Sequence, residues 1–147
     1  MTDYECELAK AEQGEAKAQH NLGVMYRIGH GVPQDYKTAL EWCTLAAEQG
    51  YVDAQFMLGA MYNNERGLPL DYKTALKWFR LAADQEDASA QFIVGLMYDK
   101  GKGVPRNEET AAKWYRLAAD QGNIEAQNNL DWLVSQRELR KNLATWK

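Results

Sequence analysis

Apolar residues follow a helical spacing along most of the chain. In the segment from Ala54 to Asn64, one helix face is marked at i, i+4, i+7 and i+8 by Ala54, Leu58, Met61 and Tyr62. A second apolar face between Asp71 and Gln85 is marked by Ala75, Trp78, Leu81 and Ala82. The pattern therefore predicts a helix, a loop with Pro69, and a second helix.

The same pattern returns every 36 residues. The repeated positions are Trp42, Trp78 and Trp114; Pro33, Pro69 and Pro105; Gly23, Gly59 and Gly95; and Tyr26, Tyr62 and Tyr98. A single helix pair cannot bury its apolar face, so repeated pairs stack on one another. We predict one all-α repeat domain over residues 1–147, with full repeats at 16–51, 52–87 and 88–123.

Partial units flank the three repeats. Residues 3–15 predict an N-terminal capping helix, and residues 124–136 repeat the first helix of a unit. Within 137–147, an i, i+4, i+7 spacing is kept by Leu139, Leu143 and Trp146. This spacing favours a capping helix that closes the open end; the alternative is a frayed, basic tail.

Caps and glycines mark the helices. Good N-cap residues precede each second helix, at Asp35, Asp71 and Asn107. A glycine such as Gly59 inside a helix costs ~1 kcal/mol relative to Ala, so its repetition predicts a neighbouring helix too close for a Cβ. Glu65 and Glu86 stand where other units have glycine at the helix ends. We expect a different loop geometry there, with Asn64 in the left-handed conformation.

The repeated residues carry a longer motif. It reads Ala-x-Ala-Gln-x-x-Leu-Gly-x-x-Tyr, then Gly-x-Gly-Val-Pro-x-Asp-Tyr, then Ala-x-x-Trp-x-x-x-Ala-Ala-x-Gln-Gly. This motif, over about residues 14–137, resembles the Sel-one-like repeat, which is similar to a tetratricopeptide repeat with a longer loop. The resemblance implies a right-handed α/α solenoid whose concave face is lined by the first helices. It also implies an adaptor role, as in bacterial signalling, envelope or host-interaction pathways and eukaryotic membrane-protein degradation complexes.

Charge and composition narrow the classes of partner. The net charge of −4 argues against a nucleic-acid groove, which is basic. No run approaches the ~18 apolar residues of a membrane span. The N-terminal residues lack the basic and apolar regions of a signal peptide, so we expect a cytoplasmic protein, or a periplasmic or secreted one if a leader has been removed. We expect a monomer, with self-association through the terminal helices as an alternative.

No set of residues predicts a catalytic, cofactor or metal site. Gly95, Gly101 and Lys102 lack the spacing and the preceding strand of a phosphate loop. His20 and His30 have no Cys or carboxylate set at metal-ligand spacing.

The cysteines also predict no chemistry. Cys43 stands in the column of Phe79 and Tyr115 and is expected to pack as a small hydrophobe. A nucleophile set of Cys43, His30 and Asp35 is therefore disfavoured. Some Sel-one-like proteins have a disulfide in each unit and are linked to β-lactam binding; the paired cysteines are absent here, so that role does not carry over.

The variable positions of the first helices predict where a partner binds. They are Lys17, His20, Val24, Arg27, Phe56, Ala60, Asn63, Phe92, Leu96, Asp99, Asn128 and Trp132. An apolar floor with a polar rim fits a peptide or a helix. Two alternatives stay open: Phe56 and Phe92 could pack in the core, and Arg27, Asn63 and Asp99 could form solvated helix ends.

The sequence thus predicts a non-catalytic protein-interaction scaffold that binds a peptide or helical segment in its concave groove. A structural self-association module is the alternative. A hydrolase using Cys43 or His20 is less favoured.

Overall fold

The computed structural model describes residues 1–64 and 69–146, without the side chain of Asn64. The described residues form helices and no strand. The helices are α1 (Asp3–Glu12), α2 (Ala16–Ile28), α3 (Tyr36–Glu48), α4 (Val52–Asn64), α5 (Tyr72–Asp84), α6 (Ala88–Lys100), α7 (Glu108–Asp120) and α8 (Ile124–Thr145).

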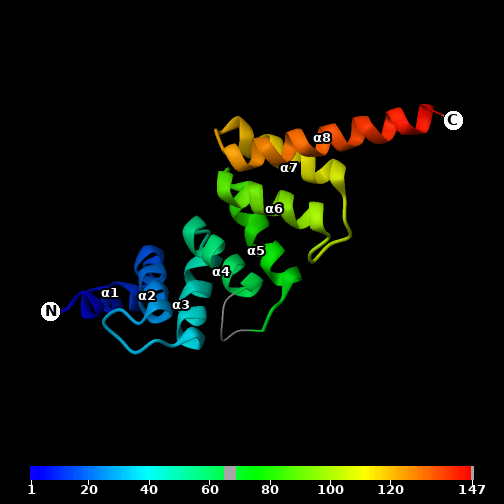
Figure 1. Cartoon of the computed structure of the whole chain (residues 1–147). Helices are drawn as coiled ribbons and strands as arrows, with labels where there is room; N and C mark the ends of the chain where they lie inside the picture. Colours follow the sequence, from blue (N-terminus) through cyan, green and yellow to red (C-terminus); the bar gives the residue numbers. More distant parts are fainter. Residues whose placement is uncertain (65–68, 147) are drawn as a thin grey trace.

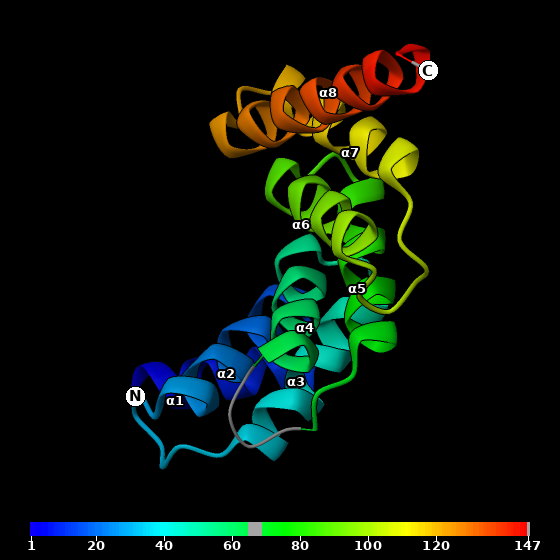
Figure 2. The same cartoon turned by 45° about the vertical axis from the view of Figure 1, so that its right-hand side comes forward.

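The helices stack as antiparallel pairs in a right-handed α/α solenoid, as the sequence predicts. Each helix packs chiefly on the helices that precede and follow it in the chain. The pairs α2–α3, α4–α5 and α6–α7 follow one another, with α1 and α8 at the two ends (Figure 1). The turned view shows the stack winding from the N-terminal pair to α8, so the two termini lie far apart (Figure 2). The first helices, α2, α4, α6 and α8, form one face of the stack, which we call the first-helix face.

The predicted N-caps are confirmed. The side chain of Asp35 accepts from the backbone N–H groups of Lys37 and Thr38. Asp71 and Asn107 accept in the same way at the starts of α5 and α7. These bonds satisfy donors that have no partner within the helix, which explains why the second helices begin at the predicted places.

The repeated glycines are needed for close packing, as predicted. A Cβ on Gly59 would lie 2.7 Å from the Phe79 ring, and one on Gly95 would lie 2.6 Å from the Tyr115 ring. Gly23 faces the thiol of Cys43 in the same way. The first helix therefore approaches its own second helix at a distance that only glycine allows.

Pairs of glutamines join each repeat to the one before it, a feature the sequence analysis missed. Gln55 is 4% exposed; its Nε2 donates to the Ala47 carbonyl at 3.2 Å, and its Oε1 accepts from Gln85 Nε2 at 2.8 Å. Gln85 also donates to the Gly50 carbonyl at 3.0 Å. The same bonds recur in the pairs Gln19–Gln49 and Gln91–Gln121.

The expected change of loop geometry at Glu86 is wrong. Glu86 adopts the left-handed conformation itself, with φ of 68°, close to the 88° of Gly50 and the 94° of Gly122. Its N–H donates to the Ala83 carbonyl at 3.0 Å, as the N–H of Gly50 does to Ala47. The stacking of the repeats thus imposes one turn geometry despite the cost to a residue with a Cβ. Glu65 lies outside the described residues, and so does the expected left-handed turn at Asn64.

The two ends of the chain differ. Helix α1 covers the first pair: Tyr4 and Leu8 pack on the cluster that contains Leu22 and Met25. At the other end, the structure contradicts both the separate capping helix and the frayed tail. Residues 137–145 simply continue α8, and the apolar side chains of Leu139, Leu143 and Trp146 are 51%, 61% and 87% exposed. No Gly or Pro follows residue 136 to break the helix, so it runs past the end of α7.

Candidate functional site

Three hollows lie between neighbouring first helices. The hollow at the N-terminal ends of α4 and α6 has a volume of about 270 Å³ and is lined by Asp53, Phe56, Asp87 and Ser89. The hollow at their C-terminal ends, of about 290 Å³, is lined by Asn63, Ile93, Leu96, Met97, Lys100 and Lys102; we call it the lysine hollow. A third, of about 160 Å³, is lined by Asp99, Lys100, Asn129 and Trp132.

The predicted groove residues fall into three groups. Lys17, Asn128 and Trp132 are exposed; Asp99 is buried; and the half-buried residues are His20, Val24, Arg27, Phe56, Ala60, Asn63, Phe92 and Leu96. Phe56, Asn63, Leu96, Asp99 and Trp132 line the hollows. The remainder line none of these three hollows, so the candidate site is centred on α4, α6 and α8.

The two phenylalanines serve both in packing and on the surface. The Phe56 ring meets the Phe79 ring edge to face with centroids 5.3 Å apart, and Phe92 lies 6.0 Å from Tyr115. Each is packed against the core cluster of its neighbours and stays half-buried. Phe56 forms part of a hollow's wall, whereas Phe92 lines none of the three hollows.

The carboxylate of Asp99 is buried, and other side chains bind it in place of water. It is 8% exposed, and its Oδ2 accepts from the Tyr115 hydroxyl at 2.9 Å. Burial and this bond to Asp99 both raise the pKa of Tyr115, so the phenol stays protonated and keeps donating. Arg106 Nε donates to the Asp99 carbonyl at 2.8 Å, and its Nη2 lies 3.8 Å from the carboxylate.

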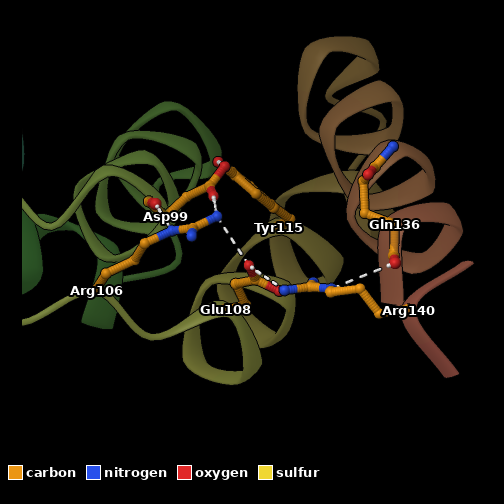
Figure 3. Close-up of polar contacts among 6 residues, drawn as sticks. All are labelled: Asp99, Arg106, Glu108, Tyr115, Gln136 and Arg140. Atoms are coloured by element: carbon orange, nitrogen blue, oxygen red, sulfur yellow. Dashed lines mark hydrogen bonds and ion pairs between the residues drawn. The ribbon is translucent and has the colours of Figure 1, made fainter. Parts of the chain in front are cut away.

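The chain of contacts continues to the last helix (Figure 3). Arg106 Nη2 lies 2.8 Å from Glu108 Oε1, and Arg140 of α8 binds the same carboxylate through both of its terminal nitrogens. Arg140 Nε also donates to the Gln136 carbonyl at 3.4 Å. These contacts connect α6, α7 and the part of α8 that extends beyond α7.

In the N-terminal part of the first-helix face, the predicted groove residue His20 packs against an aromatic ring. The His20 ring lies 5.3 Å from the Tyr51 ring, and its Nδ1 has no hydrogen-bond partner among the described residues. Burial lowers the pKa of His20, opposed by the charge of Asp53 and assisted by that of Arg27. The imidazole is therefore neutral at pH 7.

The predicted packing of Cys43 is confirmed, and it speaks against nucleophilic chemistry. Cys43 is fully buried, and burial raises the pKa of its thiol to about 12. The thiol is therefore protonated at neutral pH and out of reach of a substrate. Cys6 is exposed and unpaired.

The described part of the chain offers neither a metal site nor a membrane-spanning helix. It holds no cluster of three or more His, Cys, Asp or Glu side chains arranged to bind a metal ion. None of its helices combines the length and the apolar character needed to span a bilayer.

Sequence reasoning missed Lys100, Lys102 and Asn129 as lining residues. Lys100 is the last residue of α6 and Lys102 lies in the Gly-rich loop, on either side of Gly101. No local pattern marks them, because the hollow that they line is formed by two repeats.

The arrangement of stacked helix pairs defines an α-solenoid repeat protein. A family model described as the Sel1 repeat matches residues 16–51, 52–87 and 88–123. The chain therefore belongs to the Sel1 repeat family, whose members typically serve as non-enzymatic scaffolds that bind other proteins.

Solved structures agree with this assignment. Among similar chains is c5321 of Escherichia coli, a protective antigen of uropathogenic strains with an SLR fold, at 42% identity over 86% of this chain, with a TM-score of 0.82. This chain spans 27% of the length of that protein. A Sel1 repeat protein of Oxalobacter formigenes is 35% identical, with a TM-score of 0.80, over 89% of this chain and 98% of the other.

A more distant structure shares the fold alone. It is the cysteine-rich protein B of Helicobacter pylori, at 23% identity and a TM-score of 0.66, over 88% of this chain and 98% of that one. A search of curated protein sequences returned no match.

Proposed function

We propose that this protein is a non-catalytic scaffold that binds a peptide or a helical segment of a partner protein along its first-helix face. The observation that carries the proposal is the row of hollows between α4, α6 and α8, each of which combines at least one apolar or aromatic side chain with polar ones. Such a surface fits recognition of a peptide by buried apolar anchors surrounded by polar contacts.

The size and spacing of the hollows support a chain-like ligand. Each is smaller than the ~300–1,000 Å³ typical of pockets for whole small molecules. Successive hollows along one face suit successive side chains of one segment. The buried, protonated thiol of Cys43 supports a binding role over hydrolysis by that thiol.

A selection from a displayed library of random peptides tests the proposal. Selected peptides should bind the native chain and lose most of their affinity for the double variant Phe56→Ala and Trp132→Ala, because both side chains line hollows. The matched control is Leu45→Ala with Leu117→Ala, two side chains that are each 47% exposed on the second helices α3 and α7. Circular dichroism checks that helicity persists. Peptides whose binding depends on the leucines and not on the first-helix face would contradict the proposal.

Self-association is a second candidate, supported by an exposed apolar stripe on α8. Trp132, Leu139, Leu143 and Trp146 recur at spacings of seven, four and three residues and are 51–87% exposed. This spacing is that of a helix–helix seam. Sedimentation of the native chain and of Leu139→Ser with Leu143→Ser tests it: a dimer that dissociates in the variant supports this role, and a monomer at all concentrations rejects it.

A further inference from the structure

Two lysines at the C-terminal end of α6 border an apolar hollow. Lys100 is the last residue of α6, and Lys102 follows the left-handed Gly101, whose φ is 70°. Ile93, Leu96 and Met97 form the apolar wall beside them, and Asn63 of α4 lies opposite. The lysine hollow thus combines two ammonium groups, one amide and an apolar surface.

No carboxylate among the described residues neutralises the charge of the two lysines. In the part of the chain that the structure describes, no ion pair joins either lysine to a carboxylate. Asp99, which precedes Lys100 in the sequence, is already bound by Tyr115 and Arg106. Within the described part of the chain, the hollow therefore offers two positive charges without a carboxylate partner, in a protein whose net charge is −4.

The backbone that carries the lysines is fixed. The N–H of Lys102 donates to the Met97 carbonyl at 2.9 Å, and its ammonium group lies 5.2 Å from the centre of the Tyr72 ring. A cation above an aromatic face is attracted by the ring. These contacts hold Lys102 near the hollow and reduce the ordering cost of binding a ligand there.

The apolar wall sets a second requirement for the ligand. Ile93 and Leu96 are half-buried and Met97 is 3% exposed. A volume of about 290 Å³ has room for one or two side chains. On its other side, Lys100 borders the hollow that contains Trp132, which is 59% exposed. An apolar side chain next to an anionic group matches this combination.

We propose that the lysine hollow binds an acidic peptide segment of the partner. A carboxylate of the segment lies between Lys100 and Lys102, and an adjacent apolar side chain rests on Ile93 and Leu96. Charge-assisted hydrogen bonds to carboxylates are stronger than neutral ones, so the acidic residue orients the segment. This inference rests on the proposed function and adds the chemistry of the ligand.

Parallel selections from one displayed library of random peptides test the inference. One selection uses the native chain, and the other uses the double variant Lys100→Gln and Lys102→Gln. We expect peptides from the native chain to be enriched in Asp or Glu next to Leu, Ile or Phe. Measured by fluorescence anisotropy, they should bind the variant about tenfold or more weakly, and their affinity for the native chain should fall as salt rises.

Two controls separate the sources of binding. The double variant Lys77→Gln and Lys113→Gln removes two exposed lysines from the second helices α5 and α7 and should leave the affinity unchanged. Inorganic phosphate at millimolar concentration should not displace the peptide. Displacement would show that the lysines bind any anion and would overturn the inference.

The outcomes also separate this inference from the proposed function. Peptides that lack carboxylates, bind both lysine forms equally and yet depend on Phe56 and Trp132 would leave the function standing and overturn the acidic ligand. If no selected peptide depends on either set of residues, both proposals fail.

Discussion

At the scale of single residues, the close contact between paired helices depends on the missing Cβ of glycine. The Phe79 ring that faces Gly59 is 1% exposed and is enclosed by the core cluster around it. It cannot move away from an added methyl group without displacing its neighbours. The helical preference for Ala over Gly, ~1 kcal/mol, opposes this cost.

Gly59→Ala should therefore lower the free energy of unfolding. Overpacking costs ~1–3 kcal/mol, and we expect a net loss near 1 kcal/mol by urea denaturation. In a Phe79→Leu background the same substitution should cost less, because the smaller side chain leaves room for the methyl group. Equal costs in both backgrounds would show that the ring is not the obstacle.

Among the described residues, Glu86 alone is a non-glycine residue with a positive φ. A left-handed φ costs a residue with a Cβ roughly 1–2 kcal/mol, and the turn holds Glu86 there at φ of 68°. Glu86→Gly should raise the free energy of unfolding by roughly 0.5–1 kcal/mol, because it relieves this strain, while the greater chain entropy that glycine loses on folding offsets part of the gain. Thermal and urea denaturation measure the change.

Glu48→Gly is the matched control for this prediction. Glu48 is also exposed, but it is the last residue of helix α3. The substitution should cost up to ~1 kcal/mol there. A loss of stability in Glu86→Gly would contradict the assignment of strain to this turn.

At the scale of helices, the outer part of α8 is held near the start of α7 by the carboxylate of Glu108, which binds Arg140. The hydrogen bond from Arg140 holds the pKa of Glu108 below its ordinary value, helped by the charges of Arg140, Arg106 and Arg137 and opposed by burial. A carboxyl whose pKa is lower in the folded state stabilises that state above its ordinary pKa. This contribution is lost as the pH falls through the lowered pKa.

The outer part of α8 should therefore loosen in acid. Between pH 7 and pH 5 we expect residues 137–145 to keep their helical Cα chemical shifts, and below about pH 4 to lose them progressively, given an ordinary Glu pKa of about 4.3. Glu108→Gln should show loosened shifts already at pH 7.

Glu109→Gln serves as the control for the acid prediction. Glu109 is the next carboxylate along α7 and forms no ion pair among the described residues. It should behave as the native chain does. A native-like α8 in Glu108→Gln would show that Arg140 does not hold the helix.

The helices also show which structural features local sequence patterns predict and which they do not. The 36-residue period and the N-caps predicted each helix pair, because capping bonds and apolar spacing are local properties. The left-handed Glu86 and the uninterrupted α8 could not be predicted in this way. The turn at Glu86 is imposed by stacking of the neighbouring repeat, whose Gln121 donates to the Glu86 carbonyl at 2.9 Å. After residue 136 the sequence contains no Gly or Pro, so no local pattern marks where α8 ends.

At the scale of the whole molecule, the glutamine pairs tie each repeat to its neighbour. Removing Gln55 would remove one hydrogen bond from the Ala47 carbonyl and one from the Gln85 amide, which keep their bonds to the N–H and the carbonyl of Gly50. Each hydrogen bond of this kind contributes roughly 0.5–1.5 kcal/mol. We expect Gln55→Ala, which removes both bonds, to lower the free energy of unfolding by about 1–3 kcal/mol in urea denaturation.

The chain contains its own control for this effect. Gln127 holds the corresponding position in α8, is exposed, and donates to Asp131 at 2.9 Å. Gln127→Ala should change stability by less than ~0.5 kcal/mol. Comparable losses for both variants would show that the bonds between repeats are not the cause.

The candidate site was only partly visible in the sequence for a related reason. Phe56, Asn63, Leu96 and Trp132 could be found because they vary between repeated residues on one helix face. Lys100 and Lys102 became visible only when α4 and α6 were placed side by side, since the hollow belongs to two repeats. Asp99 could not be judged because its partner Tyr115 lies on another helix.

The glutamine pairs have one more consequence. Because each pair makes the same bonds to the unit before it, an added copy of residues 52–87 placed after residue 87 would find its partners already in position. The number of repeats can therefore change while the hydrogen bonds between neighbouring repeats stay the same. A four-repeat version should fold with the same joints and present one more interval of binding surface.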